Sequence, residues 1–228
     1  GFFGTTAALI LSKRFNIDLY EKKGTILNGA SKANQMRFHY GYHYPRSIKT
    51  FQEVNKFNKS FLKFYGNNIL GKTNNYYGIS KINSKKIYKK FINFLTKNKL
   101  YFKYSNNVHF SDFVSKPILS NEKNLNYFKI KKKIIKKLKD SKVNLRLNEQ
   151  IKKKDLKNYY RIIVACYDQN NIILHNLGLK PKKKYKFELV EKIIIKLPKY
   201  YRKESFMVLD GKFVSLDPYL GTNYHLLS

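Results

Sequence analysis

Residues 34–47 read NQMRFHYGYHYPRS and gather several side chains that could carry out chemistry. Two histidines, two arginines and three tyrosines lie within this short segment. Imidazoles can bind a metal ion or transfer protons, and arginines interleaved with aromatic rings can stack on nucleic-acid bases. The same composition suits a pocket for a planar cofactor. A metal site, a nucleic-acid site, a cofactor site and a purely structural loop are the interpretations to compare.

The metal interpretation rests on the spacing of the two histidines. His39 and His43 are four residues apart, and on a helix they could share a metal ion. Gly41 and the aromatic residues favour an extended loop instead. No carboxylate lies between Glu21 and Glu53, so a third ligand is missing nearby. The sequence therefore predicts no metal site.

The charge of the chain raises the nucleic-acid interpretation. The sequence holds 47 Lys and Arg residues against 14 Asp and Glu, a formal net charge of +33, which attracts polyanions. The basic residues are mostly lysines spread over the whole chain. They accompany many Asn, Ile, Tyr and Phe, the residue set of A/T-rich codons, and no nucleic-acid reader motif is present. We therefore expect background charge and no nucleic-acid partner.

Cysteine usage and hydropathy indicate the compartment. Cys166 is the only cysteine, so no intrachain disulfide can form. Its place at the end of a predicted strand suggests a buried, inert thiol. No apolar run reaches the length of about 18 residues that a membrane span needs, and no secretory signal is visible. We expect a cytoplasmic protein without a membrane span; the oligomeric state is not indicated.

The first 21 residues match part of a dinucleotide-binding fingerprint. Gly1 and Gly4 open a predicted helix, and Glu21 ends the next predicted strand. In βαβ units of this kind, glycines and the helix N-terminus hold a pyrophosphate, and an acid about 20 residues on binds the ribose hydroxyls. The spacing matches the last two glycines of G-x-G-x-x-G plus the acid. We expect the first strand upstream of residue 1, and an unphosphorylated adenosine ribose, as in FAD or NAD.

Apolar residues at helical spacing predict a series of amphipathic helices. A capping box made by Thr50 and Glu53 starts the second, which ends at Gly66, and Ser84 starts the third. The lysines of the last helix form a solvated face. The predicted helices lie within residues 1–15, 50–66, 84–95 and 127–141.

Other segments read as strands. Residues 160–166, YRIIVAC, form a continuous apolar run typical of parallel sheets. The last third changes character, and Asp210 and Gly211 fit a type I′ turn between antiparallel strands. The predicted strands lie within residues 16–21, 143–147, 160–166, 185–198 and 205–218.

The quoted motifs resemble the FAD-dependent oxidoreductases of the D-amino-acid oxidase and glycine oxidase superfamily. In that group the ribose-binding acid is followed by a segment small-Ser-x-x-Asn-(x)4-His-x-Gly, which runs under the flavin. Here this segment reads Ala30-Ser31, Asn34, His39 and Gly41. Residues 157–171 resemble the family's strand near the adenosine half of the cofactor, and residues 208–228 resemble its substrate-domain hairpin. Cys166-Tyr167 departs from the glycine usual after Ala165.

The resemblance implies FAD as the cofactor and a small-molecule substrate. Ser31 and Asn34 could bond diphosphate or ribityl oxygens, and Gly41 would permit close approach to the ring. Arg37 or Arg46 could pair with a substrate carboxylate. The predicted catalytic residues are Arg37, His39, His43 and Tyr44. The predicted cofactor contacts are Gly1, Phe3, Gly4, Glu21, Lys22, Ser31, Asn34, Gln35, His39, Gly41 and Ala165.

The resulting prediction is an α/β fold. A Rossmann-like FAD-binding domain lacking its first strand, in residues 1–70 and 118–180, is interleaved with an α+β substrate domain containing an antiparallel sheet, in residues 71–117 and 181–228. The predicted activity is oxidation of a small amine, amino acid or hydroxy acid by hydride transfer to flavin N5, although a fragment of residues 1–228 could be inactive by itself. The alternatives are a non-redox flavoenzyme such as a nucleotide-sugar mutase, or a basic nucleic-acid-binding protein.

Overall fold

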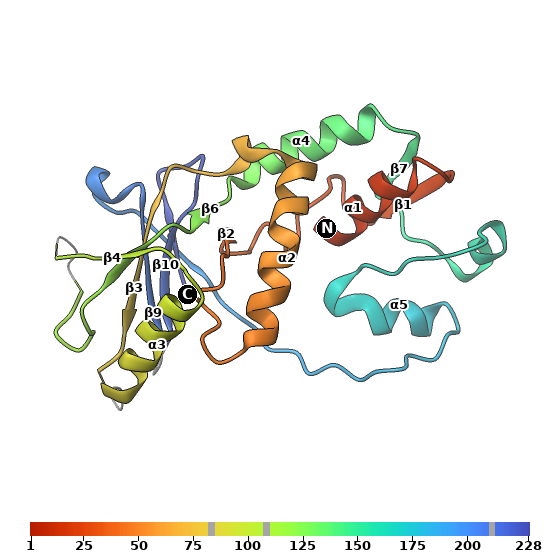
Figure 1. The fold of residues 1–228 in the computed structure, drawn as a ribbon. Helices are drawn as coiled ribbons and strands as arrows, with labels where there is room; N and C mark the ends of the chain where they lie inside the picture. Colours follow the sequence, from red (N-terminus) through yellow and green to blue (C-terminus); the bar gives the residue numbers. More distant parts are fainter. Residues whose placement is uncertain (82–84, 107–109, 210–212) are drawn as a thin grey trace. The chain divides into compact units, whose positions relative to one another are not determined.

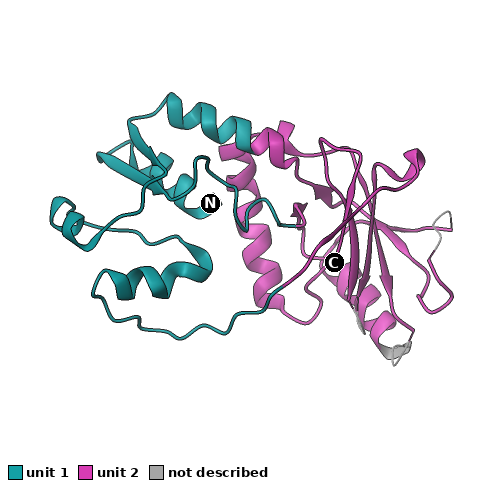
Figure 2. Cartoon of the chain, turned by 180° about the vertical axis from the view of Figure 1, so that it is seen from behind, with its two compact units in different colours: residues 1–34, 131–189 teal, residues 35–130, 190–228 magenta. Residues whose placement is uncertain are grey.

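The computed structural model describes residues 1–81, 85–106, 110–209 and 213–228 of the chain (Figure 1). The chain divides into two compact units, drawn in different colours in Figure 2. Unit 1 consists of residues 1–34 and 131–189, and unit 2 consists of residues 35–130 and 190–228.

Unit 1 contains a pair of parallel strands. β1 (Ile17–Glu21) and β7 (Val143–Leu147) are strands, as the sequence predicted for both segments, and the structure pairs them with each other along their whole length. The helix α1 (Phe2–Leu11) precedes β1, and α5 (Asn170–Asn176) lies near the end of the unit. The buried apolar side chains of unit 1 are Ala8, Leu9, Ile26, Leu27, Ile134, Leu138, Val143 and Leu177.

The prediction of a strand at residues 160–166 is wrong. This segment has no strand conformation, and Ile163 is 62% exposed. A strand needs a neighbour that pairs with its N–H and C=O groups, and no described strand pairs with this segment. The Tyr159 hydroxyl donates instead to Asp18, which holds the start of the segment against β1.

Unit 2 contains a seven-stranded sheet in the order β4-β5-β3-β9-β10-β11-β8. Neighbouring strands are antiparallel except β3 and β9, which are parallel. A separate antiparallel pair joins β2 (Arg37–Phe38) to β6 (Lys123–Asn124). The strands of the large sheet are β3 (Asn74–Ile79), β4 (Phe102–Tyr104), β5 (Ile118–Ser120), β8 (Ile193–Ile195), β9 (Glu204–Leu209), β10 (Val214–Pro218) and β11 (His225–Leu227).

Two helices predicted in unit 2 are present, but the first begins earlier than expected. α2 (Ile48–Tyr65) is capped by Ser47, whose hydroxyl accepts a hydrogen bond from the Thr50 amide at 3.3 Å. The predicted Thr50 and Glu53 box therefore lies inside the helix, while the stop at Gly66 is confirmed. α3 (Lys85–Lys97) follows Ser84, which lies outside the described residues. The helix α4 (Tyr127–Lys139) begins in unit 2 and ends in unit 1.

The core of unit 2 joins α3 to the sheet. Burying an aliphatic or aromatic side chain of this kind contributes about 1.5–3 kcal/mol to stability. Phe51 of α2 reaches the same cluster through an edge contact with Phe94, with ring centroids 5.5 Å apart. The buried members are Tyr42, Tyr77, Ile79, Phe91, Phe94, Leu95, Ile118, Met207 and Leu209.

The antiparallel character of the last third is confirmed only in part. β9 and β10 pair as predicted, but the turn predicted at Asp210 and Gly211 lies outside the described residues. Within residues 185–198 only β8 is a strand, at one end of the sheet order. Its Ile193 and Ile194 side chains are more than half exposed.

The fold is therefore mixed α/β. The compact units also differ from the predicted domain boundaries, because residues 35–70 and 118–130 belong to the unit that contains the antiparallel sheet. The pairing of β2 with β6 and the contact of α2 with the core account for this. No helix in the described part of the chain combines the length and apolar character needed to cross a bilayer.

We predict that Gly41→Ala lowers the free energy of unfolding by at least about 2 kcal/mol. Gly41 has φ +108°, and a Cβ there would lie 2.3 Å from Cδ2 of Phe51. Urea denaturation measures the change. Gly29→Ala is the matched control, because a Cβ at Gly29 meets no atom within 4 Å. Equal stabilities of the two variants would contradict the prediction.

Candidate active site

In unit 1, the predicted pyrophosphate residues gather at the start of α1. Gly1 is the N-cap of this helix and supplies no side chain to it. The Ser31 hydroxyl, distant in sequence, accepts a hydrogen bond from the Phe2 amide at 3.2 Å. The first-turn amides of a helix need such partners and favour anionic groups. The structure therefore brings together Ser31 and the helix start at Gly1.

The predicted ribose acid and the adenosine-side residues are also in unit 1. Glu21 is the last residue of β1, and its Oε1 accepts a hydrogen bond from the Lys23 amide at 3.0 Å. A Cβ on Gly4 would lie 3.5 Å from Cβ of Ala165, so these two predicted contacts are neighbours. Phe3, Lys22 and Asn34 are exposed.

The thiol beside Ala165 corrects another expectation. Cys166 is exposed and not buried, because the segment that carries it is not a strand of a sheet. Its amide donates to Oδ1 of Asn170, at the start of α5, at 2.7 Å.

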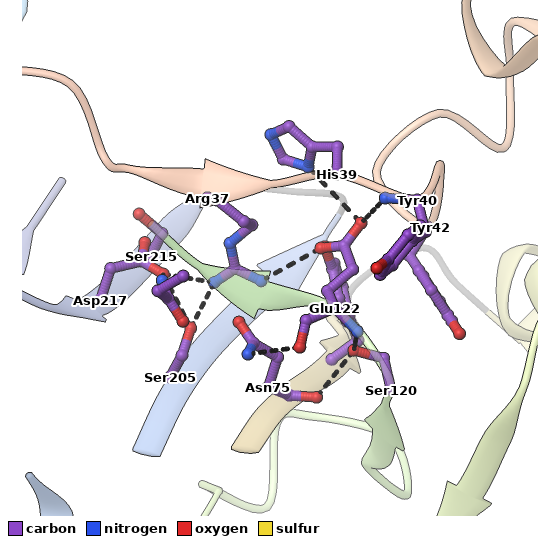
Figure 3. A network of polar contacts seen from close by, with 12 residues as sticks. Arg37, His39, Tyr40, Tyr42, Asn75, Ser120, Glu122, Ser205, Ser215 and Asp217 are labelled. Atoms are coloured by element: carbon purple, nitrogen blue, oxygen red, sulfur yellow. Dashed lines mark hydrogen bonds and ion pairs between the residues drawn. The ribbon is translucent and has the colours of Figure 1, made fainter. Parts of the chain in front are cut away.

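In unit 2, β2 brings Arg37 into a buried ionic network (Figure 3). Its Nη2 lies 2.6 Å from Oδ1 of Asp217 and donates to the Ser205 hydroxyl at 2.6 Å. Its Nη1 lies 3.7 Å from Oε2 of Glu122. Burial disfavours the charged form of Arg37, but interactions with Tyr77, Asp217 and Glu122 outweigh this and raise its pKa.

This burial corrects the substrate role predicted for Arg37. The side chain is only 1% exposed, and its guanidinium is engaged by protein carboxylates. It therefore cannot bind a substrate carboxylate without breaking a buried ion pair, which costs about 3–5 kcal/mol. Arg37 instead stabilises the strands that carry the segment 34–47.

Glu122 lies at the centre of the site, and sequence reasoning missed it (Figure 3). Its Oε1 accepts a hydrogen bond from the Tyr40 amide at 2.8 Å and lies 3.5 Å from Nδ1 of His39. Its Oε2 accepts a hydrogen bond from the Tyr77 hydroxyl. Burial raises the pKa of Glu122, but His39, Arg37 and Tyr77 lower it by more, so the carboxylate is ionised at neutral pH.

One sequence signal could have drawn attention to this acid. Glu122 is the only acidic residue between Asp112 and Asp140 in a strongly basic chain. Its partner residues are nevertheless far away in the sequence, and nothing in the sequence pairs it with His39.

The two histidines and Tyr44 form a cluster of rings. The centroids of His39, His43 and Tyr44 lie 5.5–5.6 Å apart, and the Phe213 ring is 6.2 Å from that of His43. Burial, together with the nearby His39 and Arg37, lowers the pKa of His43 to about 4. His43 is therefore neutral at neutral pH, while His39, whose side chain is 25% exposed, faces a carboxylate.

Two further predicted cofactor contacts have protein partners. A ring does approach Gly41, but it is the Phe51 side chain of α2, which explains the glycine without a cofactor. Gln35 donates through Nε2 to the hydroxyls of Ser215 and Ser228 at 2.5 and 2.7 Å. In the described ranges no group of three or more His, Cys, Asp or Glu side chains is placed to hold a metal ion.

Comparison with known proteins finds this architecture in solved structures. Glycine oxidase from Geobacillus kaustophilus matches 98% of this chain and 67% of its own length, with a TM-score of 0.70 and 10% identity. Glycine oxidase from Bacillus cereus ATCC 14579 matches 100% of this chain and 68% of its own length, with a TM-score of 0.66 and 10% identity. The chain has the fold of the glycine oxidases.

The glycine oxidase fold extends over residues of both units. The fold that the sequence motifs implied, that of the glycine oxidases, is therefore confirmed. No family model and no curated protein sequence matches the chain.

We predict that His43→Phe weakens the pH dependence of stability between pH 6.5 and 4. In this window the unfolded chain binds a proton at His43 that the folded chain does not, so the free energy of unfolding falls as the pH decreases. In the variant, the slope of the free energy of unfolding against pH should be smaller by up to about 1.4 kcal/mol per pH unit. Urea denaturation at a series of pH values measures it.

The matched control for this experiment is His175→Phe. His175 is exposed near the end of α5, and its removal should leave the slope as it is in the original protein. If the free energy of unfolding changes equally with pH in the original protein and in both variants, His43 has an ordinary pKa in the folded state.

Proposed function

We propose that the chain belongs to an FAD-dependent oxidoreductase that oxidises a small amine, amino acid or hydroxy acid. The observation that carries the proposal is the glycine oxidase fold, which covers 98% of the chain with a TM-score of 0.70. At 10% identity the fold leaves the activity open, so the residues must support it separately.

The residues of unit 1 fit the ADP half of FAD. A helix start with no N-cap side chain, next to the Ser31 hydroxyl, suits a diphosphate. A carboxylate at the end of the following strand suits two ribose hydroxyls, and Glu21 occupies that position. We propose that Gly1, Gly4, Ser31 and Glu21 hold this half, with Ala165 beside Gly4.

The residues of unit 2 would serve the substrate and the flavin ring. FAD, when bound, supplies the acceptor for the hydrogen and electrons that leave the substrate carbon. His39, His43 and Tyr44 would orient the substrate or hold a proton. Because His43 is neutral at neutral pH, it can accept a hydrogen bond there.

Reconstitution tests the proposal. The purified protein is incubated with FAD and freed of unbound cofactor by gel filtration, and its visible spectrum is recorded. We expect flavin absorption bands that bleach when the right amine, amino acid or hydroxy acid is added without oxygen. A protein that is folded by circular dichroism but retains no FAD would overturn the proposal.

We predict that Glu21→Gln weakens FAD binding by roughly tenfold or more, because a charged hydrogen-bond acceptor to the ribose is lost. Titration calorimetry or flavin fluorescence measures the dissociation constant. Glu53→Gln, on the exposed surface of α2, is the matched control and should leave the affinity unchanged. Equal affinities in the two variants would count against Glu21 as the ribose acid.

A further inference from the structure

His39 presents its two ring nitrogens to different surroundings. Nδ1 is buried, lies 3.5 Å from Oε1 of Glu122, and has no hydrogen-bond partner among the described residues. The side chain as a whole remains 25% exposed. Nδ1 therefore faces the carboxylate inside the protein, while Nε2 is the nitrogen left for a ligand.

The orientation of Glu122 is fixed by its other contacts. One oxygen accepts from the Tyr40 amide, and the other accepts from the Tyr77 hydroxyl and faces Arg37. The side chain is fully buried, so water does not compete for these oxygens. The carboxylate can therefore present only an acceptor to Nδ1 of His39.

An ionised acceptor decides where the hydrogen of the imidazole resides. A lone pair on Nδ1 would face the negative oxygen of Glu122 and be repelled, whereas an N–H group would be attracted. The hydrogen of a neutral His39 therefore belongs on Nδ1, and the lone pair belongs on Nε2.

We propose that Glu122 is a positioning residue that holds His39 with its hydrogen on Nδ1, so that Nε2 is the proton acceptor of the active site. The inference rests on the proposed function. When a substrate O–H or N–H bond breaks, its proton would form a bond to Nε2, while bound FAD would take up the C–H hydrogen together with its electron pair. The resulting imidazolium is neutralised by Glu122.

The charges around His39 support this division of roles. Arg37 is balanced against Asp217 and Glu122, so the buried network carries one more negative than positive charge. A proton on His39 removes that excess. The side chains that contact His39 are Glu122, His43 and Tyr44, and the charged Arg37 acts on two of them, Glu122 and His43.

His43 shows what the same side chain does without a carboxylate partner. It lies next to His39, and its Nδ1, like that of His39, is buried without a hydrogen-bond partner in the described part of the chain. Its surroundings keep it neutral.

The direct test is the tautomer of His39 in the protein without added ligand. Nitrogen-15 NMR of histidine-labelled protein at alkaline pH distinguishes hydrogen on Nδ1 from hydrogen on Nε2, and His39→Gln assigns the signal among the five histidines. We expect hydrogen on Nδ1. Hydrogen on Nε2 in the original protein would overturn the inference, with no mutation of the network required.

Variants test whether Glu122 is the cause. Glu122→Gln should shift His39 toward the tautomer with hydrogen on Nε2, and Glu122→Asp should restore the original tautomer. Asp217→Asn is the matched control, because it removes a buried carboxylate of the same network that contacts Arg37 and not His39. If Asp217→Asn shifts the tautomer as much as Glu122→Gln does, the effect is general loosening and the inference fails.

The FAD-loaded enzyme supplies a second readout. Glu122→Gln should lower kcat by roughly 10–100-fold with less effect on KM, and should remove the basic group from the pH profile of kcat. A normal profile in this variant would overturn the inference. A protein with hydrogen on Nδ1 of His39 that never retains FAD would instead overturn the proposed function.

Discussion

The buried guanidinium of Arg37 is the constraint on which unit 2 depends. A positive charge removed from water is tolerated only if opposite charges and hydrogen-bond acceptors meet it. Here Asp217 comes from β10, Ser205 comes from β9, and Glu122 is the residue directly before β6. The pair β2 and β6 has only two residues in each strand, so backbone hydrogen bonds alone hold it weakly. The side-chain network links this small pair to the large sheet and gives the segment 34–47 a defined position within its unit.

Local features of the fold could be predicted from the sequence. The helical spacing of apolar residues within 84–95 predicted an amphipathic helix, and Phe91, Phe94 and Leu95 of that helix are in the core. Gly66 was predicted as a helix stop and is one. Where the prediction failed, a partner distant in sequence decided the outcome. Residues 160–166 are apolar enough for a strand, but a strand exists only beside another strand.

The sequence indicated which residues belong to the candidate site, but not which residues they contact. His39, His43 and Tyr44 do come together, and Ser31 does reach the start of α1. The pairing of His39 with Glu122 could not be predicted, because no local pattern connects residues so far apart. Arg37 was selected because arginines bind carboxylates, and it does bind them. They belong to the protein itself, and the side chain is therefore closed to a substrate.

The parallel pairing of β3 with β9 has a consequence for how the chain is made. Asn74–Ile79 leaves the ribosome long before Glu204–Leu209, and Asp217 follows later still. Until then Arg37 and Glu122 exist without the second carboxylate, and the centre of the sheet has an open edge. Native pairings that span so much sequence form slowly. A nascent chain of this protein therefore has a long interval with an exposed strand edge, in which protection by a chaperone would matter most.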